Sequence, residues 1–199
     1  GHTSGVRCLE FSSDGRRLLT SSDDNTLKLW SLETKREIET LRGHDGWIAC
    51  CTFSPDGQWA LSASHDQHVR LWNLNGYEET RVLGGHVLNG HSDAVLSAAV
   101  SQDGQHVATA SRDRTARLWS AADGSELKTF AEGHSFLSMR ALFSPDGRWL
   151  FTAAFDNTVR VWNVEHGTEV GRLDHTGRNA ALAVSPDGRF LVTGSDDNT

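Results

Sequence analysis

The chain has 199 residues, a hydrophobic content of 37% and a formal net charge of -7. This content is sufficient for a packed core, and no apolar run approaches the ~18 residues that a membrane span requires. The negative charge disfavours binding that is driven by nucleic-acid phosphates. We therefore expect neither a nucleic-acid nor a membrane partner.

A histidine, a Ser or Thr, an aspartate and a tryptophan recur along the chain at fixed separations. The steps from each His are 18, 22 and 28 residues, and only the gap from a Trp to the next His varies. The recurring residues are His2, Thr20, Asp24 and Trp30; His44, Ser62, Asp66 and Trp72; His91, Thr109, Asp113 and Trp119; His134, Thr152, Asp156 and Trp162; and, in a fifth copy without a Trp, His175, Thr193 and Asp197. A repeat of about 42 residues with a rigid interior predicts a stacked or radial array.

Each repeat predicts four short strands. The first ends at Phe or Val and leads into a turn such as SPDG 54–57, because Asp-Gly between apolar runs is a strong hairpin signal. The second strand follows, as in 149–154, and the third ends on the Trp, as in 68–72. The segments 35–41 and 124–130 predict a fourth, outer strand. No run has the period or length of a helix.

The spacing also sets the repeat boundaries. We place the repeats at approximately 1–42, 43–89, 90–132, 133–173 and 174–199, with the last one partial. A second Gly-His occurs at His86, but only His91 keeps the step of 22 residues to an Asp. We therefore expect a short inserted loop around His86.

These residues resemble the WD-repeat β-propeller family, over essentially the whole chain. The resemblance implies an all-β fold in which each repeat forms a four-stranded antiparallel blade. Four blades and a partial fifth are fewer than the usual seven of the family, so we expect an open arc of a larger propeller. The chain departs from the family at the residue after each Trp, where Ser31, Asn73, Ser120 and Asn163 replace the Asp of the family name.

The grouping of Ser/Thr, His and Asp is also typical of a catalytic triad. A catalytic site needs one exposed constellation, whereas this chain has the same set in every repeat. The resemblance implies that Asp accepts a hydrogen bond from His, that His contacts the hydroxyl, and that the hydroxyl contacts the Trp indole. Because buried polar groups must be paired, we interpret the sets as structural networks.

We expect neither a cofactor nor a metal. His65 and His68 flank Asp66 and could ligate a metal, but no thiolate partner or zinc spacing accompanies them. The three cysteines, Cys8, Cys50 and Cys51, form a poor disulfide framework and favour a reducing cytoplasm.

Positions at which the repeats differ are the candidates for partner binding, because packing demands the same residue in every repeat and a partner does not. Such positions occur two and three residues after the His and just before the turn Asp. The candidates are Trp47, His65, Arg112, Phe136, Leu137, Phe155 and Arg178. Large aromatic residues and Arg dominate interface energetics. The alternative is that Trp47 and Phe136 only cover a neighbouring blade.

The sequence thus predicts a non-enzymatic scaffold that binds other proteins or peptides at the propeller mouth. Two alternatives remain: a sensor or regulatory arm of a larger signalling protein, such as a bacterial kinase or nucleotide-binding switch, and a propeller enzyme. We also expect the segment to be a fragment that packs against the remaining blades of its parent chain.

Overall fold

The computed structural model describes residues 1–74, 78–83, 90–130 and 134–198. All secondary-structure elements in these ranges are β-strands, with no helix among them. The strands form four sheets of four strands and one sheet of two. The prediction of an all-β chain built from propeller blades is confirmed. The loop expected around His86 lies outside the described residues.

We call the five sheets blades 1 to 5. Each blade arranges its strands side by side in chain order, and the paired strands are antiparallel. Blades 1 and 2 contain β1 (Val6–Phe11), β2 (Arg17–Ser22), β3 (Thr26–Ser31) and β4 (Arg36–Arg42), then β5 (Ile48–Phe53), β6 (Trp59–Ser64), β7 (Val69–Asn73) and β8 (Glu78–Leu83). Blade 3 contains β9 (Val95–Val100), β10 (His106–Ser111), β11 (Ala116–Ser120) and β12 (Glu126–Phe130).

Blade 4 contains β13 (Ser138–Phe143), β14 (Trp149–Ala154), β15 (Thr158–Asn163) and β16 (Glu169–Asp174), and blade 5 contains β17 (Asn179–Val184) and β18 (Leu191–Ser195). Because consecutive strands run antiparallel, the turn after the first strand and the turn after the second lie at opposite ends of a blade. We call these ends the hairpin end and the mouth end.

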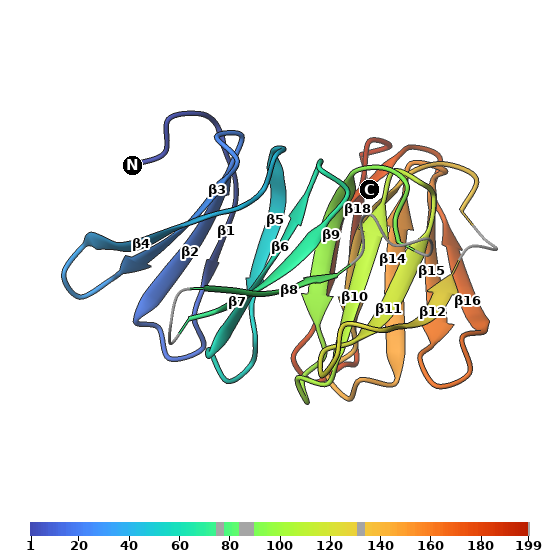
Figure 1. Cartoon of the computed structure of the whole chain (residues 1–199). Coiled ribbons are helices and arrows are strands. Elements are labelled where there is room, and N and C mark those ends of the chain that lie inside the picture. Colours follow the sequence, from blue (N-terminus) through green and yellow to red (C-terminus); the bar gives the residue numbers. More distant parts are fainter. Residues whose placement is uncertain (75–77, 84–89, 131–133, 199) are drawn as a thin grey trace. The chain divides into compact units, whose positions relative to one another are not determined.

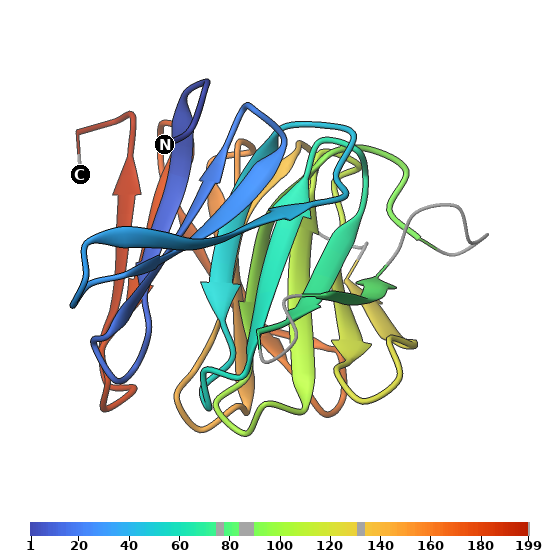
Figure 2. The same cartoon turned by 60° about the vertical axis from the view of Figure 1, so that its left-hand side comes forward.

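The chain divides into two compact units, Gly1–Ala98 and Ala99–Thr199. In the first unit β5 packs against β1 and β2, so that blade 2 lies against blade 1 (Figure 1). The turned view in Figure 2 shows the same contact, with β5 in cyan next to the blue strands of blade 1. Leucines of blade 1 meet apolar side chains of blade 2 in one core that contains Leu19, Leu27, Leu29, Leu41, Ile48, Cys51, Phe53 and Trp72.

The second unit has its own core between blades 3 and 4. Small side chains of β10 and β11, such as Ala108 and Ala116, face Leu150 and Trp162 of blade 4. Phe130 packs against Trp162, with ring centroids 5.3 Å apart. Full burial of a leucine or phenylalanine side chain stabilises a fold by roughly 1.5–3 kcal/mol, so these contacts between blades supply much of the driving force for folding.

The hairpin ends share one turn geometry. In blade 2 the Ser54 hydroxyl donates a hydrogen bond to Asp56 Oδ1 (2.5 Å), and the same oxygen accepts the backbone N–H of Gln58 (3.0 Å). Gly57 then takes a positive φ of 66°, which glycine adopts without steric cost. The equivalent Ser and Asp make the same contacts in the other four turns, at Ser12 and Asp14, Ser101 and Asp103, Ser144 and Asp146, and Ser185 and Asp187.

Candidate functional site

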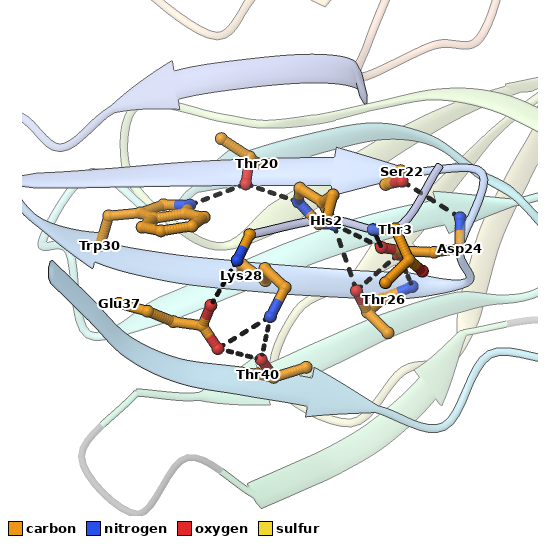
Figure 3. Close-up of polar contacts among 11 residues, drawn as sticks. His2, Thr3, Thr20, Ser22, Asp24, Thr26, Lys28, Trp30, Glu37 and Thr40 are labelled. Atoms are coloured by element: carbon orange, nitrogen blue, oxygen red, sulfur yellow. Dashed lines mark hydrogen bonds and ion pairs between the residues drawn. The ribbon is translucent and has the colours of Figure 1, made fainter. Parts of the chain in front are cut away.

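The recurring polar residues of repeat 1 lie in one chain of hydrogen bonds (Figure 3). Trp30 Nε1 on β3 lies 2.8 Å from Thr20 Oγ1 on β2, and the same oxygen lies 2.8 Å from His2 Nε2. On its other side, His2 Nδ1 lies 2.9 Å from Asp24 Oδ2. Asp24 occupies the turn between β2 and β3, and its carboxylate also accepts the backbone N–H groups of Thr3 and Thr26.

The donors along this chain follow from the groups themselves. An indole N–H can only donate, so Thr20 must accept from Trp30 and is left to donate its single proton to His2 Nε2. The proton of the neutral imidazole then sits on Nδ1, from which it is donated to Asp24. Every link therefore has one donor and one acceptor, and the single proton of the hydroxyl at the centre is used.

Repeats 2 and 4 contain the same network. His44 Nδ1 lies 2.7 Å from Asp66 Oδ2, His44 Nε2 lies 2.7 Å from Ser62 Oγ, and Trp72 Nε1 donates to Ser62 (2.8 Å). In repeat 4, His134 lies 3.0 Å from Asp156 and 2.8 Å from Thr152, which accepts from Trp162 (2.8 Å). In repeats 1, 2 and 4, these networks join the loop that carries the His and the turn that carries the Asp to the two central strands of the blade.

In repeats 3 and 5 the equivalent residues make some of the same contacts. Trp119 donates to Thr109 (2.9 Å), Asp113 accepts the backbone N–H of Thr115 (2.9 Å), and His91 is buried. In repeat 5, which ends before a Trp, His175 lies 3.3 Å from Asp197 and 2.9 Å from Thr193.

Ionisation supports the same assignment of protons. Burial raises the pKa of Asp66, but the hydrogen bonds from His44 and from the backbone N–H groups of His68 and Asp45 outweigh it and hold the pKa well below its ordinary value. Burial lowers the pKa of His134 despite the nearby Asp156. In repeat 4, where the pKa of Asp156 is also lowered, the structure therefore favours a neutral His134 imidazole that faces a carboxylate anion.

A second polar pair per repeat was not predicted from the sequence. The Lys28 ammonium on β3 is buried, and it donates to Glu37 Oε1 (2.8 Å) and Thr40 Oγ1 (2.5 Å), both on β4 (Figure 3). Arg117 with Glu126 and Arg160 with Glu169 form the same pair in blades 3 and 4. The signal was present in the sequence: the residue 26 positions after the His is always basic and the residue 35 positions after it is always Glu, at Lys28, Arg70, Arg117 and Arg160 and at Glu37, Glu79, Glu126 and Glu169.

The divergent positions lie next to each other at the mouth end. In four repeats the residue before the turn Asp donates its backbone N–H to the carbonyl of the residue three after the His, over 2.9–3.1 Å. The four donor and acceptor pairs are Asp23 and Gly5, His65 and Trp47, Phe155 and Leu137, and Asp196 and Arg178. A constant backbone thus presents side chains that differ from blade to blade.

Arg7 joins the mouth ends of blades 1 and 2. It lies at an irregularity in the pairing of β1 with β2, a feature that typically redirects a side chain. Its guanidinium binds both carboxylate oxygens of Asp23 (2.7 Å each) and lies 5.6 Å from the centre of the Trp47 ring. The same indole packs against His65, with ring centroids 5.4 Å apart, yet Trp47 remains 50% exposed. Trp47 is thus both held by neighbours and accessible.

The second unit has its own mouth residues. Arg178 lies over the Phe155 ring, with its guanidinium carbon 5.3 Å from the ring centre. Phe136 is 50% exposed, Leu137 is half-buried, and Arg112 is exposed. Sequence reasoning identified these positions and missed Arg7, because a single Arg in a strand gives no sign that the pairing is irregular there.

Within residues 1–74, 78–83, 90–130 and 134–198, no group of three or more His, Cys, Asp and Glu side chains is arranged to hold a metal ion. No helix long and apolar enough to cross a membrane occurs in the same part of the chain.

Comparison with known proteins gives matches along the whole chain. The family model described as "WD domain, G-beta repeat" matches residues 1–31, 35–73, 84–120, 124–163 and 167–199. The "Probable E3 ubiquitin ligase complex SCF subunit sconB" of Arthroderma benhamiae is 54% identical over 41 residues, which are 21% of this chain and 6% of that protein.

Two further relatives match over similar lengths. The "Ribosome biogenesis protein BOP1 homolog" of Anopheles gambiae is 44% identical over 41 residues, 21% of this chain and 5% of that protein. "Apoptotic protease-activating factor 1" of Danio rerio is 54% identical over 33 residues, 17% of this chain and 3% of that protein. Each match spans about one repeat and a small part of a much longer relative.

Proposed function

Because the chain belongs to the WD40 family of WD-domain, G-beta repeats, we propose that it is a non-enzymatic scaffold that binds other proteins at the mouth ends of its blades. The observation that carries the proposal is Trp47, which Arg7 and His65 hold in place while half of its surface stays open. A rigid, partly exposed aromatic side chain beside an Arg is typical of an interface anchor.

The chemistry of the networks supports a scaffold over a hydrolase. A nucleophilic hydroxyl needs an open approach for its substrate, whereas the hydroxyls of Thr20 and Thr152 lie inside a network in which each accepts an indole N–H and contacts an imidazole. Both hydroxyls lie on central strands and are buried. This favours fixation of the blades over attack on a substrate.

The relatives support a role in assemblies. Their names include a subunit of a ubiquitin ligase complex and a ribosome biogenesis protein. The second candidate function is that of a regulatory arm of a larger signalling protein. It is favoured by the match to an apoptotic protease-activating factor, because the matching segment makes up only 3% of that relative. The sequence that flanks these 199 residues in the full reading frame would distinguish the two functions.

Substitution at the mouth tests the proposal. We expect Trp47→Ala, Phe136→Ala and Phe155→Ala to reduce capture of the partners that the parent chain retains, because each removes apolar surface from the mouth ends of the blades. The measurement is quantitative affinity capture with each variant, after thermal unfolding has shown that its midpoint is close to that of the parent.

Ile38→Ala is the matched control. Ile38 is also an exposed apolar residue, but it lies on the outer strand β4 and not at the mouth. Equal capture by the parent and all three mouth variants would reject the mouth as the binding surface.

A further inference from the structure

The hairpin ends of blades 1 and 2 show what fills the space between two blades. Arg17, at the start of β2, donates from its guanidinium to the Gly57 carbonyl in the turn of blade 2 (2.7 Å). The guanidinium carbon also lies 5.6 Å from the centre of the Phe53 ring. The positive charge of Arg17 contributes to the lowered pKa of Asp14, after larger effects from Ser12 and Arg16. An arginine side chain therefore occupies this gap.

The equivalent gap between blades 3 and 4 has a smaller residue in place of that arginine. The position 15 residues after the His is Arg17 in repeat 1 and His106 in repeat 3. A cavity of about 810 Å³ opens here, and its lining includes His106, Asp103 and, from the turn of the next blade, Gly147. Gly147 corresponds to Gly57, and Asp103 corresponds to Asp14.

The charges around this cavity favour a cation. Its lining contains three acidic residues, Asp103, Asp146 and Glu165, and two basic residues, Lys128 and Arg148. The Lys128 ammonium donates to the backbone carbonyl of Glu165, and Arg148 Nε lies 3.9 Å from Asp146. Hydrogen bonds from Ser101 and the backbone of Gln105 lower the pKa of Asp103, so this carboxylate is charged at neutral pH.

The walls of the cavity suit the flat face of a guanidinium and an apolar neighbour. Trp149 is half-buried in the lining, and aromatic faces attract cations. Leu127, also in the lining, is exposed, whereas Leu118, which pairs with the adjacent Lys128, is buried. A partner that covers Leu127 would remove apolar surface from water.

We propose that the cavity between blades 3 and 4 binds an arginine side chain of a partner protein segment, whose guanidinium takes the place that Arg17 fills between blades 1 and 2. The guanidinium donates to the Gly147 carbonyl and pairs with Asp103, and an apolar residue beside the arginine covers Leu127. A planar group with several fixed donors matches a carbonyl and a carboxylate better than the ammonium of lysine does. The site lies at the hairpin end and does not depend on the proposed mouth surface.

Titration of the 199-residue chain with a capped Ala-Leu-Arg-Leu-Ala peptide tests the proposal. We expect a saturable shift of the Trp149 indole N–H resonance, assigned with Trp149→Phe, and a dissociation constant at least about fivefold lower than for the lysine and citrulline peptides. Absence of a shift at millimolar arginine peptide, or equal binding of the lysine peptide, overturns the proposal. Equally tight binding of free argininamide would show a small-molecule site and reject a protein segment as the occupant.

Four variants locate the binding. Asp103→Asn removes the charge but keeps an oxygen for the turn, and we expect it to weaken binding about fivefold. Asp14→Asn, the same change in the turn of blade 1, is the matched control and should leave binding unchanged. His106→Arg should place a guanidinium of this chain at the Gly147 carbonyl, as Arg17 does at Gly57, and prevent binding of the peptide. His106→Trp, which copies Trp59 of blade 2, provides a second variant with a larger side chain at this position should the first not fold. Retained binding in a folded His106 variant, or equal losses in the two Asn variants, contradicts the proposal.

Trp47→Ala separates this inference from the proposed function. Peptide binding should be unchanged in this variant even if capture of partners at the mouth is lost. Loss of peptide binding in Trp47→Ala would place the peptide at the mouth and overturn the assignment to the cavity.

Discussion

The hydroxyl at the centre of each network explains which residues its position tolerates. It must accept one hydrogen bond from an indole and donate one to an imidazole, and both Thr20 and Ser62 do so. Valine has the shape of threonine but offers neither function, so it would leave a buried indole and a buried imidazole without partners. The choice between Ser and Thr is free, whereas the hydroxyl is required.

Removal of the carboxylate from a network is expected to destabilise the chain. In Asp66→Ala, His44 loses its acceptor and the backbone N–H groups of Asp45 and His68 lose theirs. A buried polar group without a partner costs about 1–3 kcal/mol, and we expect a loss of this size in the free energy of unfolding. Urea or thermal unfolding of the variant measures it.

Asp45→Ala is the control for this substitution. Asp45 is an exposed aspartate that directly follows the network histidine, so its loss should change stability by no more than about 0.5 kcal/mol. Equal unfolding midpoints for Asp66→Ala and the parent would contradict the structural interpretation of the networks.

Individual residues differ in how far the sequence predicts them. His2, Thr20 and Trp30 were identified because they recur at a fixed spacing, and the resemblance to the WD-repeat family implied how they pair. Arg7 was missed because the direction of its side chain depends on an irregularity in the pairing of β1 and β2. The residue types in β1 do not indicate this irregularity. Spacing predicts which groups meet, and local backbone geometry decides where a long side chain points.

At the scale of the strands, the buried Lys or Arg of the third strand ties it to the fourth. Lys28 lies on β3, and its partners Glu37 and Thr40 lie on β4, the outer strand of the blade. An outer strand has a neighbour on one side only, so a charge pair that reaches it adds to the backbone hydrogen bonds. The pair leaves a buried ammonium dependent on a single carboxylate.

Loss of that carboxylate is expected to weaken β4. In Glu37→Gln the ammonium of Lys28 stays buried without its counter-charge, and we expect a loss of about 1 kcal/mol in the free energy of unfolding. The cost is smaller than for a fully buried pair because the Glu37 side chain is 31% exposed. Chemical unfolding, together with hydrogen exchange of the β4 amides, checks this.

Glu39→Gln on the same strand serves as control, because Glu39 is exposed and contacts the backbone of Thr40 rather than Lys28. If both variants unfold at the same denaturant concentration, the pair between Lys28 and Glu37 makes no net contribution to stability.

The strands themselves were well predicted, and the charge pairs within them were not. The Asp-Gly turns and the Trp positions indicate where each strand begins and ends, and the observed strands follow them. A charged residue in a strand usually faces water, so the residue types of Lys28 and Arg160 alone do not indicate burial. The repeats, when aligned with one another, show that a Lys or Arg in the third strand always occurs together with a Glu in the fourth.

At the scale of the whole molecule, the first blade exposes a face that the second blade buries. Leu9 and Phe11 are 59% and 57% exposed, whereas the equivalent Cys51 and Phe53 of blade 2 are 1% and 5% exposed and lie in the core with blade 1. Blade 5 likewise exposes Val192. These faces are apolar at positions that form contacts between blades elsewhere in the chain, but here their side chains are exposed.

We expect the isolated 199-residue chain to self-associate through such faces, because exposed contiguous apolar surface favours association. Sedimentation velocity at increasing concentration should show species larger than a monomer, and Phe11→Asp should shift the distribution toward the monomer. Ile38→Asp adds the same charge on the outer strand and should have a smaller effect. A monodisperse monomer at every concentration would contradict the expectation of an open arc with uncovered ends.

The cavity between blades 3 and 4 could not be predicted from the sequence. Its lining comes from residues far apart in the sequence, such as Asp103, Leu127 and Gly147, and a motif comparison records residue types but not the space between them. Sites that depend on such a space require coordinates.

The closure of each network within its own repeat has a consequence for how such a chain changes during evolution. The hydrogen bonds that join Asp66, His44, Ser62 and Trp72 all lie within one repeat. A duplication or an exchange of one repeat therefore carries its complete set of donors and acceptors with it, and only the apolar faces must adapt to a new neighbour. Lineages can thus alter the number and order of repeats in steps of one whole unit, while each unit inherits its internal geometry intact.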